Sequence, residues 1–164
     1  MPGSATPALL ALRRAGVAHS VHEYELDEAR ARTEGRHAYG LEAAAALGVP
    51  AERIFKTLVA SVDDRLILAL VPVSAELDLK RLADAAKGRR ASMAEPAAAE
   101  RATGYVVGGI SPLGGRRPMP AVVDASALDH PSVLVSAGRR GLQVELAPTD
   151  LVRLTRATVA PIAR

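Results

Sequence analysis

The sequence contains no cysteine, no tryptophan and very few other aromatic residues. The lack of cysteine excludes disulfide bonds, a thiolate nucleophile and zinc–thiolate sites. The four histidines are not spaced like metal ligands: His19 and His22 are close, but three positions apart on a strand they face opposite sides. We therefore expect no metal ion and no other cofactor.

Long apolar runs are also missing, and no segment approaches the length of a membrane-spanning helix. Residues 1–8 have neither a basic end nor a long apolar stretch, so we expect no signal peptide and a cytoplasmic protein. The 164 residues are enough for one hydrophobic core, built mainly from Ala, Val and Leu. We expect a single domain over residues 1–164.

Positive charge is concentrated in the second part of the chain. Up to Leu79 there are 8 basic and 11 acidic residues, and after it 13 basic and 7 acidic residues. The second part contains the basic pairs Lys80-Arg81, Arg89-Arg90, Arg116-Arg117 and Arg139-Arg140. This asymmetry favours a polyanionic partner such as a nucleic acid, although a solvated basic surface would give the same pattern.

A glycine-rich stretch from Gly104 to Gly115 is the most distinctive part of the sequence. The apolar run Tyr105 to Val107 predicts a short buried strand, which ends at the pair Gly108-Gly109. The next residues include Pro112, whose ring fixes its own φ and restricts the residue before it. Glycines allow another molecule to approach the backbone closely, but a simple β-turn would also require them.

Short helices and short strands are mixed along the chain. Helices are predicted over residues 6–15, 39–47, 78–87, 95–102 and from Thr149 or Asp150 to about residue 155, and an exposed loop over residues 27–37. Strands are predicted over residues 17–26, 54–60, 66–73, 91–93, 121–124, 133–136, 141–146 and 158–162. This order lacks the strict alternation of a doubly wound sheet. We expect a mixed α/β (α+β) fold with a curved, barrel-like, mostly antiparallel sheet and surrounding helices.

Lys56 interrupts an otherwise apolar strand. Alternation places Lys56 with Leu58 on one face, and Phe55 with Thr57 on the other. Such a lysine either protects an edge strand from aggregation or provides a cation in a cleft. In a cleft, the cation could bind a phosphate or a carbonyl oxygen that gains negative charge.

A second glycine-rich turn, Ser136 to Gly141, has two arginines between glycines at the end of a strand. It is similar in logic to a phosphate-binding turn but lacks the P-loop spacing, and a plain hairpin with exposed arginines explains it equally well. Neither Ser136 nor Ser111 lies in a Gly-x-Ser-x-Gly motif. We therefore do not expect serine-hydrolase chemistry.

Four stretches together resemble the YbaK family of free-standing editing domains, which are related to the inserted editing domain of bacterial prolyl-tRNA synthetase. They are Phe55-Lys56-Thr57-Leu58, Leu77-Asp78-Leu79-Lys80, Thr103 to Gly114 and Ser136 to Leu142. The resemblance runs from about Thr6 to Ile162. It implies hydrolysis of mischarged aminoacyl-tRNA, removal of cysteine from tRNA(Pro) in close relatives, and a mixed α/β fold with a curved, barrel-like sheet.

The resemblance also implies the site residues. The expected catalytic residues are Lys56, Gly108, Gly109 and Ser111, and the expected substrate-binding residues are Tyr24, Tyr39, Thr57, Ile110, Pro112, Ser136 and Gly138. From the basic pairs, we also expect Arg116, Arg117, Arg139 and Arg140 to bind tRNA phosphates. Relatives can carry Asp where this chain has Gln143, whose amide can still form hydrogen bonds.

No protein nucleophile stands out, and the resemblance implies that the cysteine thiol of the substrate attacks its own carbonyl. Lys56 would bind the 3′-terminal nucleotide or the carbonyl oxygen, the N–H groups of Gly108 to Ser111 would stabilise the oxyanion, and Tyr24 and Tyr39 would bound a small pocket. Two alternatives remain: a deacylase for another mischarged tRNA such as Ala-tRNA(Pro), and a non-catalytic module that binds tRNA or a synthetase. Prolyl-tRNA synthetase is a plausible partner by family analogy.

Overall fold

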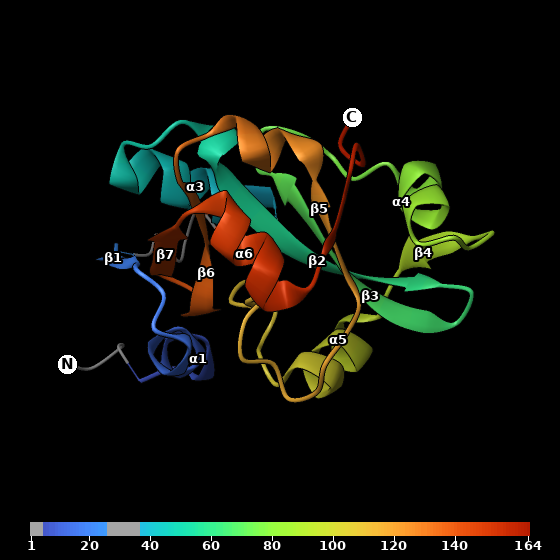
Figure 1. Ribbon diagram of the computed structural model, residues 1–164, viewed down its shortest axis with the longest axis horizontal. Coiled ribbons are helices and arrows are strands. Elements are labelled where there is room, and N and C mark those ends of the chain that lie inside the picture. Colours follow the sequence, from blue (N-terminus) through green and yellow to red (C-terminus); the bar gives the residue numbers. More distant parts are fainter. Residues whose placement is uncertain (1–4, 26–36) are drawn as a thin grey trace.

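The computed structural model describes residues 5–25 and 37–164, except for the side chains of residues 37–39. It contains an eight-stranded sheet with helices on both of its faces (Figure 1). The strands are β1 (Ser20–Glu23), β2 (Ile54–Val62), β3 (Arg65–Pro72), β4 (Ala91–Met93), β5 (Ala121–Asp124), β6 (Val133–Arg139), β7 (Leu142–Leu146) and β8 (Thr158–Ala160). The helices are α1 (Pro7–Ala15), α3 (His37–Leu47), α4 (Leu79–Ala85), α5 (Pro96–Thr103) and α6 (Pro148–Thr155), with short 3₁₀ turns at η1 (Ala51–Arg53) and η2 (Ala125–Asp129).

The sheet is mixed in direction, with the strand order β1-β7-β6-β2-β3-β5-β8 and β4 paired to β2. The pairs β1–β7, β6–β7, β2–β3 and β2–β4 are antiparallel. The pairs β2–β6, β3–β5 and β5–β8 are parallel. This confirms the mixed α/β fold. The pairings follow an open path from β1 to β8, so the barrel-like closure that we expected stays a prediction.

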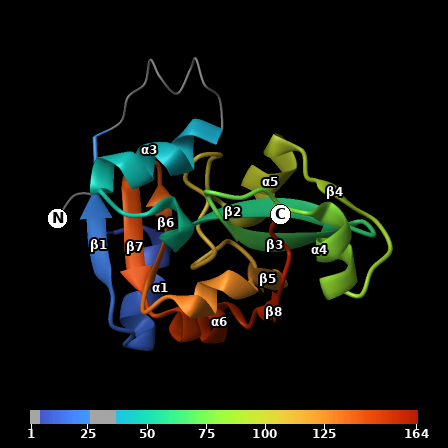
Figure 2. The same ribbon diagram turned by 90° about the horizontal axis from the view of Figure 1, so that it is seen from above.

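Different helices cover the two faces of the sheet. On one face, α1 and α6 contribute Leu9, Leu12 and Leu151 to a core that includes Phe55 of β2. On the other face, Leu82 of α4 packs with residues of β2 and β3. α3 covers this second face at the β6–β7 end (Figure 2), where Ala43 packs with Ile54 and Leu134.

Local sequence features explain where several elements begin and end. The Thr6 side chain accepts a hydrogen bond from the Leu9 N–H and begins α1, and Gly16, at φ 66°, ends it. Asp63 and Asp64 both have positive φ, as a tight turn between antiparallel strands requires. None of the helices in the described residues is long and apolar enough to cross a membrane.

Several predicted bounds are corrected by the structure. The strand predicted over Tyr105 to Val107 is wrong, because these residues form an irregular segment with a bend at Tyr105 and the start of a turn at Val107. Tyr105 is buried, and its hydroxyl donates to the Leu113 carbonyl at 2.6 Å, whereas Val106 is 63% exposed. The apolar residues therefore pack within a loop instead of forming a ladder. α6 begins at Pro148, because proline is favoured in the first turn of a helix. The loop predicted over residues 27–37 lies outside the described residues, except that His37 already belongs to α3.

Candidate active site

The glycine-rich segment from Gly104 to Arg116 forms a closed loop. At its neck, the Arg116 N–H donates to the Thr103 carbonyl at 2.9 Å. Inside the loop, the Leu113 N–H donates to the Ser111 hydroxyl at 3.2 Å. Ser111 is only 2% exposed, so its hydroxyl is part of the loop's internal packing. The loop is therefore a fixed element, and Ser111 has the geometry of a positioning residue.

The middle of this loop lies against the turn between β6 and β7. A Cβ atom added to Gly109 would be 2.6 Å from the Arg139 Cα and 2.8 Å from the Arg140 backbone N. Real Cβ atoms do not approach a backbone so closely, so only glycine fits here. The two glycine-rich segments, which are about thirty residues apart in the sequence, therefore meet at one place.

The β6–β7 turn is shaped by its own polar contacts. The Gly138 N–H donates to the Ser136 hydroxyl at 3.2 Å, and Gly138 has a φ of 108°. A Cβ atom at Gly138 would be 2.9 Å from the Tyr105 ring. Tyr105 therefore connects the two loops from the core side, while Gly109 connects them directly.

Lys56 lies where the pairing of β2 changes. β6 pairs with β2 at Ile54 and Phe55, and β4 pairs with the same side of β2 only from Ala60. Lys56 and Ser136 are the residues that follow directly after the β2–β6 ladder. β3 pairs with the other side of β2 from Phe55 to Val62, so β2 lies inside the sheet and the edge-strand explanation for Lys56 is wrong. The lysine lies at an opening in the pairing within the sheet.

The charge of Lys56 is held in a partly buried environment. Burial lowers the pKa of its ammonium group, and the carboxylate of Glu76 opposes part of this shift. A partly desolvated cation interacts more strongly with a developing negative charge than a solvated one does. Lys56 therefore suits contact with a carbonyl oxygen or a phosphate.

Tyr24 and Gln143 form one polar group on the α3 side of the sheet. Burial raises the pKa of the Tyr24 phenol, and hydrogen bonds with the Gly141 backbone and the Gln143 side chain oppose this shift. Gln143 is 8% exposed and is paired with both His22 of β1 and Ser136 of β6 in the strand register. Its Oε1 is buried without a hydrogen-bond partner in the described structure. The register thus places Tyr24, Gln143 and Ser136 in one region.

Arg140 is turned inward by an ion pair. Its guanidinium lies 3.2 Å from the carboxylate of Glu42, which is on α3 and only 6% exposed. Arg139, in contrast, is exposed and lies 3.8 Å from Glu23. The two adjacent arginines therefore have different environments, and Arg139 is the one available to a ligand at the surface.

The remaining predicted residues are distributed around these loops. Thr57 faces the opposite side from Lys56, and its Oγ1 is buried without a partner in the described residues. Ile110 packs against the core cluster beside α1. Tyr39 belongs to α3, but its side chain lies outside the described residues. Arg116 and Arg117 are exposed at the neck of the loop, beside α5, and not at the β6–β7 turn.

Sequence reasoning missed Glu42 and left Gln143 out of the site. Glu42 is a lone carboxylate in the alanine-rich segment Leu41 to Ala46, which looks like an ordinary helix with one solvated charge. Its burial beside Arg140 depends on residues that are 98 positions apart. A single charge in an otherwise apolar helix was the one available indication.

The chain is similar to several known proteins. A family model described as an aminoacyl-tRNA editing domain matches residues 34–154. A protein of Enterococcus faecalis assigned as a Cys-tRNA(Pro)/Cys-tRNA(Cys) deacylase, EbsC, is 40% identical over 121 residues, which is 73% of each chain. A crystal structure assigned as a trans-editing enzyme for prolyl-tRNA synthetase is 29% identical with a TM-score of 0.83, over 100% of this chain and 99% of the other. A scaffold structure from computational epitope grafting is 27% identical with a TM-score of 0.84, over the same shares.

Proposed function

Because the chain belongs to the aminoacyl-tRNA editing domain family, we propose that it is a trans-editing deacylase that removes mischarged cysteine from tRNA(Pro). The observation that carries the site assignment is the contact of Gly109 with the Arg139–Arg140 backbone, beside the strand that carries Lys56. This contact unites the two loops, and the β2–β6 ladder, which ends at Phe55 and Val135, puts Lys56 beside the start of the second loop in the strand register. We also propose that the protein acts together with prolyl-tRNA synthetase and that it is located in the cytoplasm.

The reaction cleaves the ester between the aminoacyl carbonyl and the terminal ribose. In the proposed route, the substrate thiol attacks its own carbonyl carbon, and a C–S bond forms. The tetrahedral intermediate carries a negative oxygen; when it collapses, the C–O bond to the ribose breaks and the thiol proton passes to the ribose oxygen. The protein must therefore stabilise an oxyanion and orient a small side chain, and it needs no nucleophile of its own.

Lys56 and the loop N–H groups are our candidates for stabilising the oxyanion. The Gly109 N–H already donates to the Val106 carbonyl at 2.9 Å, so Gly109 serves the site through its close packing. The N–H groups of Gly108, Ile110 and Ser111 have no hydrogen-bond acceptor among the residues that the structure describes. They are the donors that we assign to the oxyanion, together with the Lys56 ammonium.

Recognition of the substrate is assigned to the surrounding polar residues. Tyr24 and Gln143 would contact the aminoacyl group, with Tyr39, Pro112, Ser136 and Gly138 lining the site. Thr57, which faces the other side of β2, is not assigned to it. Arg139 is exposed beside the turn and would contact a tRNA phosphate, because phosphate contacts supply most nonspecific affinity for nucleic acids. Arg140 would support the turn through Glu42.

The proposal is tested by single-turnover deacylation of Cys-tRNA(Pro). We expect Lys56→Ala to lower the rate by about 100-fold, as for loss of one oxyanion-stabilising group. Lys80→Ala, which removes an exposed lysine from α4, is the matched control and should retain the wild-type rate. Ser-tRNA(Pro) should resist cleavage if the thiol attacks.

The results separate the alternatives. An unchanged rate for Lys56→Ala would remove this lysine from the mechanism. Faster cleavage of Ala-tRNA(Pro) than of Cys-tRNA(Pro) by the wild type would show a different substrate preference. Saturable tRNA binding without cleavage of any aminoacyl-tRNA would refute the deacylase and favour a binding module.

A further inference from the structure

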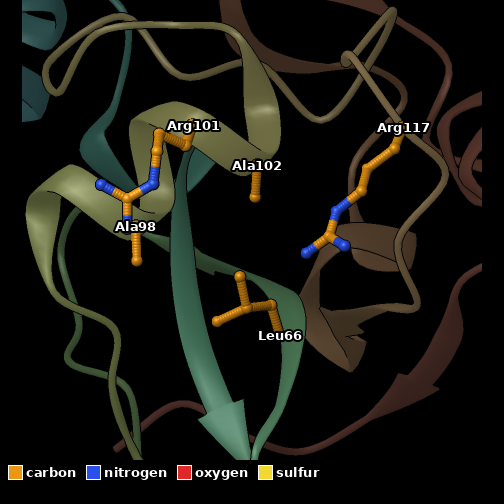
Figure 3. A pocket seen from close by; sticks show the side chains of 5 residues that line it. All are labelled: Leu66, Ala98, Arg101, Ala102 and Arg117. Carbon is orange, nitrogen blue, oxygen red and sulfur yellow. The ribbon is translucent and has the colours of Figure 1, made fainter.

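Two hollows lie beside the neck of the glycine-rich loop and share one lining residue, Arg117; together they are called the groove. The first has a volume of about 380 Å³ and lies between α5, Leu66 of β3 and Arg117 (Figure 3). The second, of about 620 Å³, continues past Ser111 and Pro112 to Arg156 at the end of α6. The groove therefore borders the same loop whose middle contacts the β6–β7 turn.

Three exposed arginines follow this groove. Arg101 lines the first hollow from α5, Arg156 lines the second, and Arg117 lies between them. Figure 3 shows the Arg117 side chain extending from the loop toward Ala102 and Leu66. The rest of the lining is mostly apolar, including Leu68, Met119 and Leu154. Within the described chain, no acidic residue lines either hollow.

We propose that this groove binds the phosphate backbone of the tRNA arm that carries the amino acid. This inference rests on the proposed function. A row of arginines without a neighbouring carboxylate is complementary to successive phosphates, and an apolar floor accommodates riboses and bases. The groove thus extends recognition beyond the reacting ester.

Arg156 occupies a position that the backbone itself does not favour. It ends α6 at φ 54° and ψ 37°, a left-handed conformation that helix ends usually give to glycine. A cation near the last helical carbonyls has a local electrostatic benefit, but glycine would adopt this conformation without strain. Arg156→Gly therefore removes a groove charge without weakening the fold, which separates binding from stability.

The test measures binding of uncharged tRNA(Pro) at several salt concentrations. The variants are Arg101→Gln, Arg117→Gln, Arg156→Gly and the triple substitution. We expect each single change to weaken binding about fivefold, and the triple change to weaken it about 100-fold. Each lost phosphate contact should also reduce the slope of log K against log salt by about 0.7 to 0.9. Arg14→Gln, which removes an exposed arginine from the last turn of α1, is the matched control and should bind like the wild type.

A second measurement locates the contact along the RNA. The same ester is presented on full-length Cys-tRNA(Pro) and on a cysteinylated CCA trinucleotide, both at subsaturating concentration. The ratio of the cleavage rate on the tRNA to the rate on the trinucleotide should be about 100-fold lower for the triple variant than for the wild type. An equal loss on both substrates would overturn the proposal, because the arginines would then act at the ester. Unchanged tRNA affinity with weakened binding to prolyl-tRNA synthetase would also overturn it and assign the groove to a protein. Wild-type protein that binds tRNA through these arginines but cleaves neither ester would support the groove and refute the deacylase.

Discussion

Gly109 lies directly against Arg139: a Cβ atom on the glycine would be 2.6 Å from the arginine's Cα. This contact joins two loops from different parts of the chain without any hydrogen bond or ion pair. The absence of a side chain at Gly109 therefore permits this close approach, and the arrangement of the two loops depends on it sterically.

We expect Gly109→Ala to separate the two loops. The new methyl group must displace backbone, which typically costs about 1–3 kcal/mol, and the rate of Cys-tRNA(Pro) cleavage should fall at least about tenfold. Gly115→Ala is the matched control in the same loop, because its Cβ would be no closer than 3.6 Å to any other atom outside its chain neighbours. Cleavage rates and thermal unfolding of both variants check this; equal behaviour would show that the close contact is not required.

The pH dependence of cleavage should respond to Glu76. Burial lowers the pKa of Lys56 below 10.5, and Glu76 raises it in part, so Glu76→Gln should lower it further. In our proposal, the protonated ammonium is the active form. As the pH is raised, the cleavage rate, corrected for spontaneous hydrolysis, should therefore begin to fall at a lower pH in the variant than in the wild type. Asp64→Asn, an exposed charge in the β2–β3 turn, should leave the profile unchanged. If the rate fell at the same pH in both proteins, the loss of activity on raising the pH would not be due to deprotonation of Lys56.

Ser111→Ala should weaken the loop without abolishing activity. The substitution removes the acceptor of the Leu113 N–H in a buried turn, which we expect to cost about 1 kcal/mol of stability. Cleavage should fall only a few-fold, because the hydroxyl positions the loop. Complete loss of cleavage in a folded variant, or an acyl-enzyme trapped on Ser111 in the wild type, would instead identify a nucleophile.

The ion pairs made by the two arginines of the β6–β7 turn should contribute differently to the free energy of unfolding, which replacing the glutamate of each pair will show. Glu42→Ala leaves the buried guanidinium of Arg140 without its carboxylate, and breaking such a pair typically costs about 3–5 kcal/mol. Glu23→Ala removes the exposed partner of Arg139 and should cost less than about 1 kcal/mol. Urea unfolding measures both. Similar losses would show that the Glu42–Arg140 pair is not a structural support of the turn.

Much of the fold was predictable because its determinants are local. The helix from Thr6, the turn at Asp63 and the strand that carries Lys56 each depend on residues within one short window. The failure at Tyr105 has the opposite cause. The apolar run Tyr105 to Val107 would look the same in the sequence of a strand and of a loop. In the folded chain this segment is a loop, in which the Tyr105 hydroxyl donates to the Leu113 carbonyl.

The sequence names candidate members of the site, and both their membership and their roles stay predictions. The glycine-rich loop, Lys56 and the β6–β7 turn were identified from motifs, and the structure places the two loops in contact. The pattern gave no means of distinguishing Arg139 from Arg140, because Glu23 and Glu42, the carboxylates beside them, lie on other elements.

The sequence by itself determined the family, the local elements and the positions where only glycine or a cation would serve. The tertiary structure decided which of these positions meet: Gly109 with Arg139, Arg140 with Glu42, and Arg117 with α5 along the groove. The physical reason is the distance along the chain over which each interaction acts. Caps, turns and alternation act over a few residues, whereas burial, pKa shifts and ion pairs depend on neighbours that only the folded chain brings together.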